Sequence, residues 1–194
     1  MGELRVPPVV TPVVAMLASD ADFFQIAKTG LEAMFGPVEL ESPAYPFDKT
    51  VYYTPTMGPS LLRMFFSFKR LGDPAALVEW KLNANKLEAD FKHTLAKYPG
   101  IQMDTLAERP INLDPGYVTG AKLVLASTKD FAHRIYLREG IFAEITMGFR
   151  GDSWVSHHFT FPDFKSGIYD DFFKKVRDWH LRKVRAWNKI NYAI

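Results

Sequence analysis

The chain has 194 residues, of which 47% are hydrophobic, 14% aromatic and 24% charged, and its formal net charge at pH 7 is +2. The aromatic content excludes a disordered chain, and the length predicts one domain over residues 1–194. Because cysteine is absent, disulfides, thiolate zinc sites, iron–sulfur clusters and cysteine nucleophiles are excluded.

The N-terminal part is expected to form a buried strand and then a helix. The apolar run at 9–18 has no basic segment before it and is shorter than the ~20 residues that span a bilayer, so it predicts a strand at 13–17. Without an export signal, the expected location is the cytoplasm. Ser19 is expected to cap a helix that ends at Gly36-Pro37. The next expected elements are a short strand at 38–41, a long loop at 42–58 and a buried strand at 61–68.

The clearest helix is expected over residues 73–95. Asp73 is a good N-cap, and Pro74 suits the first helical position, where no backbone N–H is needed. Apolar residues then recur every three or four positions, which predicts one buried stripe. This stripe comprises Leu77, Trp80, Ala84, Leu87, Phe91 and Leu95.

The middle of the chain is predicted to turn at 114–116, where the sequence reads Asp-Pro-Gly after a short strand at 111–113. Residues 118–128 fit a helix or a strand, because periodicity does not separate the two in a short apolar run. Thr119 as a cap, with two alanines, favours the helix. The elements expected after it are a hairpin of strands 133–137 and 141–149 around Arg-Glu-Gly, and a strand at 154–161.

The last element is expected to be a long helix, capped by Ser166 and running to about residue 190. Segregated strands with long helices predict an α+β fold, with an antiparallel or mixed sheet and about three main helices. A ferredoxin-like sandwich with additions is one such arrangement.

Most nucleotide-binding and catalytic motifs are absent. The sequence contains no Gly-x-Gly-x-x-Gly, Gly-x-Ser-x-Gly or His-Glu-x-x-His. Gly116, Gly120 and Lys122 partly resemble a phosphate loop, but their spacing is wrong and no hydroxyl residue follows the lysine.

The densest polar segment is 112–144. Counting across the expected hairpin places Arg134 opposite Glu144. One interpretation is a cross-strand ion pair. The other is a pocket in which Lys122 and Arg134 neutralise a phosphorylated or carboxylated ligand, such as a nucleotide or RNA segment, and His133 or Glu144 acts as the base. The ligand-binding side chains expected in this segment are Asp114, Tyr117, Lys122, Arg134 and Tyr136.

Two further sites are conceivable. Asp48 and Tyr52 lie in a tyrosine-rich loop that predicts either a stacking or sugar-binding wall or ordinary exposed tyrosines. His133, His157 and Asp163 could form a metal site of a hydrolase, whereas the alternative is strand histidines with one of them at the surface.

The final helix is basic and amphipathic. Such a helix can bind RNA, an anionic membrane or an acidic partner, while the alternative is a solvated outer face of a docked helix. The residues expected to contact RNA are Lys174, Lys175, Arg177, Arg182, Lys183 and Arg185.

Several segments together resemble one family. They are Asn-Leu-Asp-Pro-Gly-Tyr at 112–117, the apolar and charged run at 122–131, His-Arg-Ile-Tyr-Leu at 133–137, Gly-Ile-Phe-Ala-Glu at 140–144, and the earlier 46–48, 52–53 and 57–58. The chain resembles the prokaryotic domain-of-unknown-function family numbered 4416 over nearly its whole length. The resemblance implies no reaction and no catalytic residues. Some similar sequences are labelled GTP-binding, but this chain lacks both the phosphate loop and an Asn-Lys-x-Asp motif.

Overall fold

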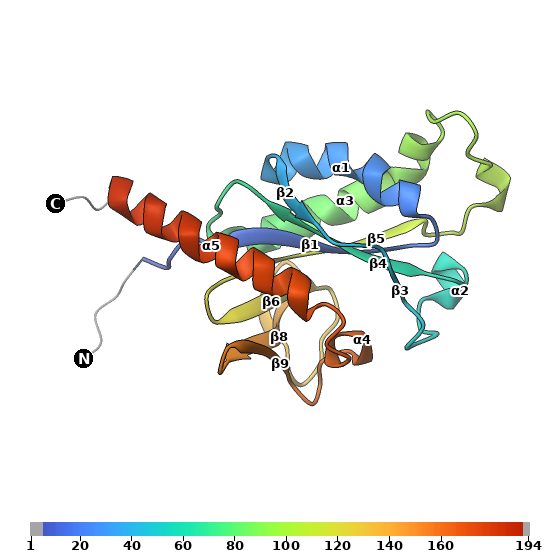
Figure 1. Ribbon diagram of the computed structural model, residues 1–194. Helices are drawn as coiled ribbons and strands as arrows, with labels where there is room; N and C mark the ends of the chain where they lie inside the picture. Colours follow the sequence, from blue (N-terminus) through green and yellow to red (C-terminus); the bar gives the residue numbers. More distant parts are fainter. Residues whose placement is uncertain (1–5, 192–194) are drawn as a thin grey trace.

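The computed structural model describes residues 6–191 and has an α+β fold (Figure 1). The strands are β1 Thr11–Ala18, β2 Val38–Glu41, β3 Tyr45–Pro46, β4 Leu62–Phe68, β5 Ile111–Val118, β6 Lys122–Ser127, β7 Ile135–Arg138, β8 Ile141–Arg150 and β9 Ser153–Ser156. The α-helices are α1 Ala21–Phe35, α2 Thr54–Met57, α3 Leu77–Leu95, α4 Pro162–Lys165 and α5 Asp170–Asn191. Short 3₁₀ turns lie at Pro74–Ala76 and Met103–Thr105.

All the strands join one antiparallel sheet. Its order is β2-β4-β1-β5-β6-β8-β7, with β3 paired to β4 and β9 paired to β8. The succession β1-α1-β2-β4-α3-β5, with the spatial order β2-β4-β1-β5, is compatible with the expected ferredoxin-like arrangement. Strands β6 to β9 and helices α4 and α5 are additions to that unit.

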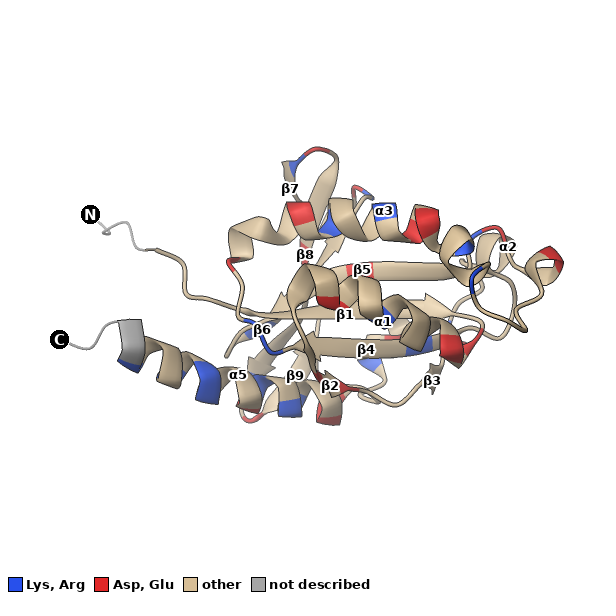
Figure 2. Cartoon of the chain, turned by 90° about the horizontal axis from the view of Figure 1, so that it is seen from above, with Lys and Arg blue, Asp and Glu red and all other residues tan. Residues whose placement is uncertain are grey.

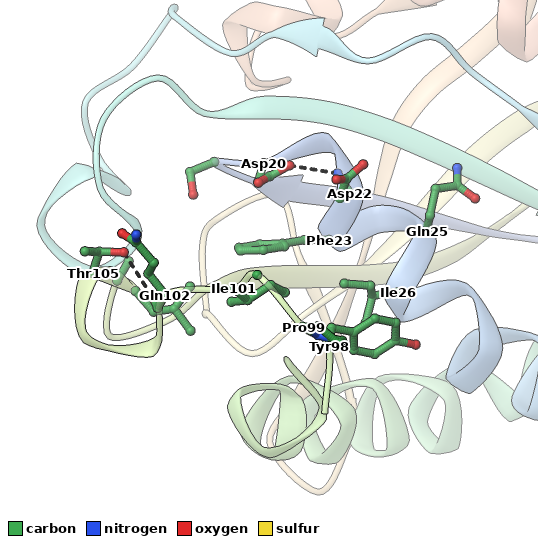
Figure 3. Close-up of a pocket in the computed structure, with 14 residues that line it drawn as sticks. Asp20, Asp22, Phe23, Gln25, Ile26, Tyr98, Pro99, Ile101, Gln102 and Thr105 are labelled. Atoms are coloured by element: carbon green, nitrogen blue, oxygen red, sulfur yellow. Dashed lines mark hydrogen bonds between the residues drawn. The ribbon is translucent and has the colours of Figure 1, made fainter. Parts of the chain in front are cut away.

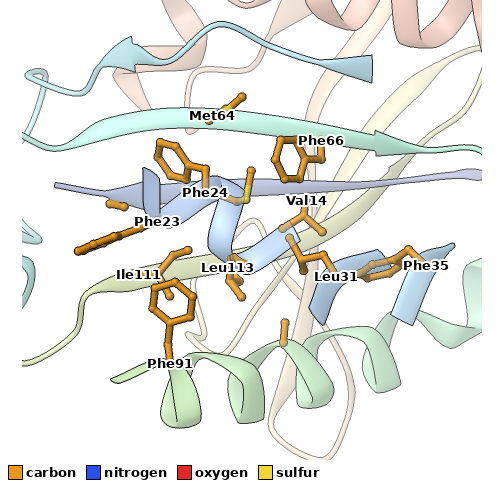
Figure 4. Packing of buried hydrophobic residues seen from close by; sticks show 14 of the residues in the cluster. Val14, Phe23, Phe24, Leu31, Phe35, Met64, Phe66, Phe91, Ile111 and Leu113 are labelled. Carbon is orange, nitrogen blue, oxygen red and sulfur yellow. The ribbon is translucent and has the colours of Figure 1, made fainter. Parts of the chain in front are cut away.

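Helices cover both faces of the sheet, so its central strand is buried throughout. Helices α1 and α3 lie on one side of β1, β4 and β5, and α5 lies on the other (Figure 1). Alternate residues of β1 therefore enter different cores. Val14 packs with Phe66 and Phe91 on the side of α1 and α3 (Figure 4), whereas Ala15 packs with Phe173 of α5.

The expected turn at 114–116 is wrong, because these residues continue β5. Strand β5 pairs with β1 over its whole length, with Pro115 opposite Val14. Proline is tolerated where its missing N–H faces an unpaired edge. Gly116 has a different reason to be there, since a Cβ at this position would overlap the carbonyl oxygen of Val124 in β6. Pro115 thus lies at the unpaired edge of β5, and Gly116 lies where the backbones of β5 and β6 come close together, so the pair does not form a turn.

The helix expected at 118–128 is also wrong, because residues 122–127 form strand β6 between β5 and β8. Sheet pairing on both sides outweighs the weak helical preference of the alanines. The other elements are mostly confirmed, including the hairpin of β7 and β8 with Gly140 at φ 74°. Several boundaries differ from expectation: α1 is capped by Asp20 rather than Ser19, β7 begins at Ile135, β9 ends at Ser156 and α5 begins at Asp170. The expected loop at 42–58 contains the short elements β3 and α2.

Among the residues that the structure describes, no helix is both long and apolar enough to cross a membrane.

Candidate functional site

Strands β5 and β6 separate, and this separation creates a polar cavity. They pair only at Gly116–Leu125, Tyr117–Val124 and Val118–Leu123, whereas β5 pairs with β1 at eight positions. The first part of β5 therefore has no strand beside it on the β6 side. Pro115 faces this same edge and has no N–H to offer a neighbouring strand.

Side chains of α3 replace the missing strand. Leu113 N donates to Oε1 of Glu88 at 2.7 Å, and its carbonyl accepts from Nζ of Lys81 at 2.7 Å. Both backbone groups are thus satisfied at a buried position, as they must be when water is excluded. The side chain of Lys81 is only 3% exposed, so its charge also needs partners.

Asp114 is the main counter-ion of Lys81. The lysine Nζ lies 2.8 Å from Asp114 Oδ1 and 3.7 Å from Glu88 Oε1, and Asn112 Nδ2 donates to Asp114 Oδ2 at 2.6 Å. Burial by itself would raise the pKa of Asp114, but Lys81 and Asn112 outweigh that effect and the pKa is lowered. For Glu88 burial prevails over Lys81 and Arg109, so its pKa is raised.

The predicted pairing of Arg134 with Glu144 is present. Arg134 Nε donates to Glu144 Oε2 at 2.8 Å, and Nη1 donates to Ser127 Oγ at 2.8 Å. His133 Nε2 lies 3.3 Å from the same carboxylate oxygen. The cross-strand ion pair is therefore formed, and its two residues also line a cavity, which Lys122 does not line.

The cavity has a volume of about 310 Å³ and is lined by side chains from β4, β5, β6, β8 and α3 and from the connecting loops. Its walls carry more cations than anions. The cationic residues are Arg63, Lys81, Arg109, Lys129 and Arg134, and the anionic residues are Asp114 and Glu144. Tyr53 also lines it, and burial, followed by the charge of Asp114, raises the pKa of this tyrosine to about 12.

One wall of the cavity holds an incompletely satisfied ion pair. Arg63 and Asp163 are both buried, with Nη2 and Oδ2 3.3 Å apart, and Tyr169 donates to the same Oδ2 at 3.2 Å. Arg63 Nε and Asp163 Oδ1 have no hydrogen-bond partner among the described residues. An unpaired buried donor is costly, and here an unpaired buried acceptor of Asp163 accompanies it.

The predicted site residues are divided between two places. Asp114, Arg134 and Glu144 line the polar cavity. Tyr117, Lys122 and His133 instead line a neighbouring hollow of about 260 Å³ that also reaches Glu144. Glu144 is the group that the two places share. The strands therefore direct these neighbouring residues to two openings and not to one pocket.

The remaining predicted ligand-binding residues lie outside the cavity. Tyr136 is exposed on β7 and packs edge-on against Phe142. Asp48 is exposed and pairs with Lys49 at 3.3 Å. Tyr52 is exposed, but its hydroxyl accepts from Nζ of Lys129, a cavity residue, at 2.7 Å.

The structure does not assemble the metal set expected from the sequence. The ring of Phe159 stacks with both His133 and His157, at centroid distances of 4.4 and 5.1 Å. Asp163 belongs to the ion pair with Arg63. No group of three or more metal-ligating side chains occurs in the part of the chain that the structure describes.

Several cavity residues were missed in the sequence. Lys81, which lines the cavity, and Glu88 behind it both lie off the apolar stripe predicted for α3, yet both side chains are at least nine-tenths buried. Their spacing of seven residues, two helical turns, places them on one face and was the available signal. Arg63 lies within an apolar strand and Arg109 in a segment without periodicity, so neither pattern indicated a site residue.

A second, larger cavity of about 770 Å³ lies at the start of α1 (Figure 3). Its charged lining residues are Asp20 and Asp22, and no cation faces them. Asp20 Oδ1 already accepts from the backbone N of Asp22, so the positive end of the helix is capped from within. Its chemistry is therefore less distinctive than that of the polar cavity.

Comparison with known proteins gives one finding. Residues 8–180 match the model of a family described as Domain of unknown function (DUF4416). Neither the curated proteins nor the solved structures yield a match.

Proposed function

The chain belongs to the DUF4416 family, and we propose that it binds a small phosphorylated or carboxylated molecule in the polar cavity between β5 and β6. The observation that carries this proposal is the excess of cations at the cavity walls, where five basic side chains face two carboxylates. Arginine and lysine are the side chains that proteins use to hold phosphate and carboxylate groups.

The local charges support an anionic ligand over a neutral one. Glu88 and Asp163 stand behind the cavity wall and offset Lys81 and Arg63. Together with the two lining carboxylates they reduce the five positive charges to a net charge of +1. A ligand with one or two negative charges would bring the site close to neutrality.

The size of the cavity limits the ligand. Small-molecule sites usually measure about 300–1,000 Å³, and this cavity is at the lower end of that range. Tyr53, Phe161 and Phe164 supply apolar wall beside the charges. A phosphosugar, a mononucleotide or a di- or tricarboxylate fits this combination better than a polymer.

If the bound molecule also reacts, Glu144 and His133 are the pair placed to move a proton. Their contact of 3.3 Å lies at the border of the two hollows. Ligand binding is the part of the proposal that the charges support directly.

The test is a thermal-shift series with inorganic phosphate, ribose 5-phosphate, AMP, GTP and citrate, followed by titration calorimetry. A ligand at 100 times its dissociation constant should stabilise the protein by about 2.7 kcal/mol. Lys129→Ala and Arg109→Ala are informative because these side chains are not deeply buried, and Lys86→Ala on the outside of α3 is the matched control.

Arg134→Ala gives the decisive comparison, provided that circular dichroism shows it folded. Loss of binding in this variant, with binding retained in Lys86→Ala, supports the proposal. Unchanged affinity in Arg134→Ala, Lys129→Ala and Arg109→Ala would refute it.

A further inference from the structure

Helix α5 extends beyond the sheet that it covers. Its first half is anchored, because Phe173 and Val176 are buried and His180 Nδ1 lies 3.0 Å from the hydroxyl of Thr11 in β1. After His180, none of residues 181–189 is buried. Figure 1 shows this last part of α5 projecting past the ends of the strands.

The projecting part is basic without any compensating acid. Residues 179–191 contain no aspartate or glutamate, and Figure 2 shows Lys and Arg along this end of the helix. Arg182, Arg185 and Lys189 are spaced by three and four residues, so they share one face. Over seven residues they form a row about 10 Å long. Exposed Lys175 lies on the same face two turns before Arg182, with Asp178, which is 3.8 Å from Arg177, between them.

Some cations of α5 contact the rest of the fold, whereas those of the basic row do not in the part of the chain that the structure describes. Arg177 Nε donates to Gly120 O at 2.7 Å, and its guanidinium lies 3.6 Å from the ring centroid of Phe149, so Arg177 holds the helix in place. Lys174 lies 3.7 Å from Asp152. Of the expected RNA-contacting residues, Lys175, Arg182 and Arg185 remain without such contacts among the described residues.

We propose that the row formed by Lys175, Arg182, Arg185 and Lys189 binds the phosphate backbone of a single-stranded nucleic acid without base selectivity. Along this face Arg182, Arg185 and Lys189 each lie about 5–6 Å from the next, and Lys175 lies about 10 Å before Arg182, so each can reach a different phosphate. An anionic membrane is disfavoured, because a helix in the interface inserts its apolar face. The large apolar side chains of the anchored half are buried against the sheet, and those of the projecting half, Leu181, Val184 and Trp187, are partly buried.

The experiment measures the affinity of the full chain for a fluorescent 20-nucleotide RNA by anisotropy at several salt concentrations. Four phosphate contacts on a single strand predict a slope of log affinity against log salt of about −2.8, or a loss of about 50-fold between 50 and 200 mM salt. Replacing Arg182, Arg185 and Lys189 together by Gln should make that slope about 2 units shallower.

A charge-matched control separates the helix from the net charge of the molecule. Lys69, Lys86 and Lys97 are exposed and lie off α5, and their triple Gln variant has the same net charge as the helix variant. Retention of the salt slope in this control, with its loss in the helix variant, supports the proposal. Equal losses in both variants, absence of RNA binding, or tighter binding to phosphatidylserine vesicles than to RNA would overturn it.

Discussion

Replacement of Lys81 by Met tests how the cavity is built. The ammonium group is 3% exposed and bonds both Leu113 O and Asp114 Oδ1, at 2.7 and 2.8 Å. Lys81→Met keeps the length of the side chain but leaves a buried carboxylate and a backbone carbonyl without their donor. Removing one partner of a buried ion pair costs about 3–5 kcal/mol. For a chain of this length, that loss lowers the melting temperature by roughly 6 to 20 °C.

Urea unfolding followed by tryptophan fluorescence measures this loss directly. Lys86→Met is the matched control, because it is exposed on the same helix and should change the free energy of unfolding by less than about 0.5 kcal/mol. Adding Asp114→Asn to Lys81→Met should cost less than Asp114→Asn alone, with a coupling of about 0.5–3 kcal/mol. A loss below about 1 kcal/mol for Lys81→Met would refute the assigned role of the lysine.

The remaining predictions concern pH and backbone packing. Because the folded-state pKa of Asp114 is lowered, its stabilising contribution is present above the unfolded pKa of about 3.9 and is lost as pH falls, so Asp114→Asn should flatten the acid limb of the stability curve. The pKa of Glu88 is raised, so the wild type should lose stability relative to Glu88→Gln as pH rises above about 4.3. If the stability of Asp114→Asn and of Glu88→Gln changed with pH in the same way as that of the wild type, both assignments would be contradicted. Gly116→Ala, whose Cβ would overlap Val124 O, should cost about 1–3 kcal/mol in urea unfolding, whereas Gly148→Ala, with open space around it, should cost clearly less.

The periodic parts of the fold could be predicted from the sequence. Helix α3, the buried strand β1 and the hairpin of β7 and β8 carry strong local signals, and the structure confirms them. The hairpin also gave the pairing of Arg134 with Glu144, because strand register follows from the position of the turn. The α+β class followed from the succession of these elements.

The residues around the cavity could not be predicted in the same way, because tertiary pairing decided them. The Asp-Pro-Gly segment has turn chemistry, yet full pairing with β1 keeps it extended. No local pattern relates the cavity cations, because Arg63 lies in β4, Lys81 in α3 and Arg109 in a loop. The spacing of Lys81 and Glu88 on one face of α3 was the one available signal, and it gains meaning only when a partner such as Asp114 is known.

Pro115 in β5 helps to keep β5 and β6 apart. The cause of this opening matters for the question of whether the cavity binds a ligand. A valine at position 115 would offer an N–H that β6 could pair with, and the sheet could close. Proline offers none, so the edge of β5 is satisfied by Lys81 and Glu88 from α3. Buried ion pairs are often no more stabilising than well-packed apolar residues. The charges therefore satisfy the open edge of β5 without adding stability beyond an apolar alternative, and the anion-binding proposal is one explanation of why they are kept.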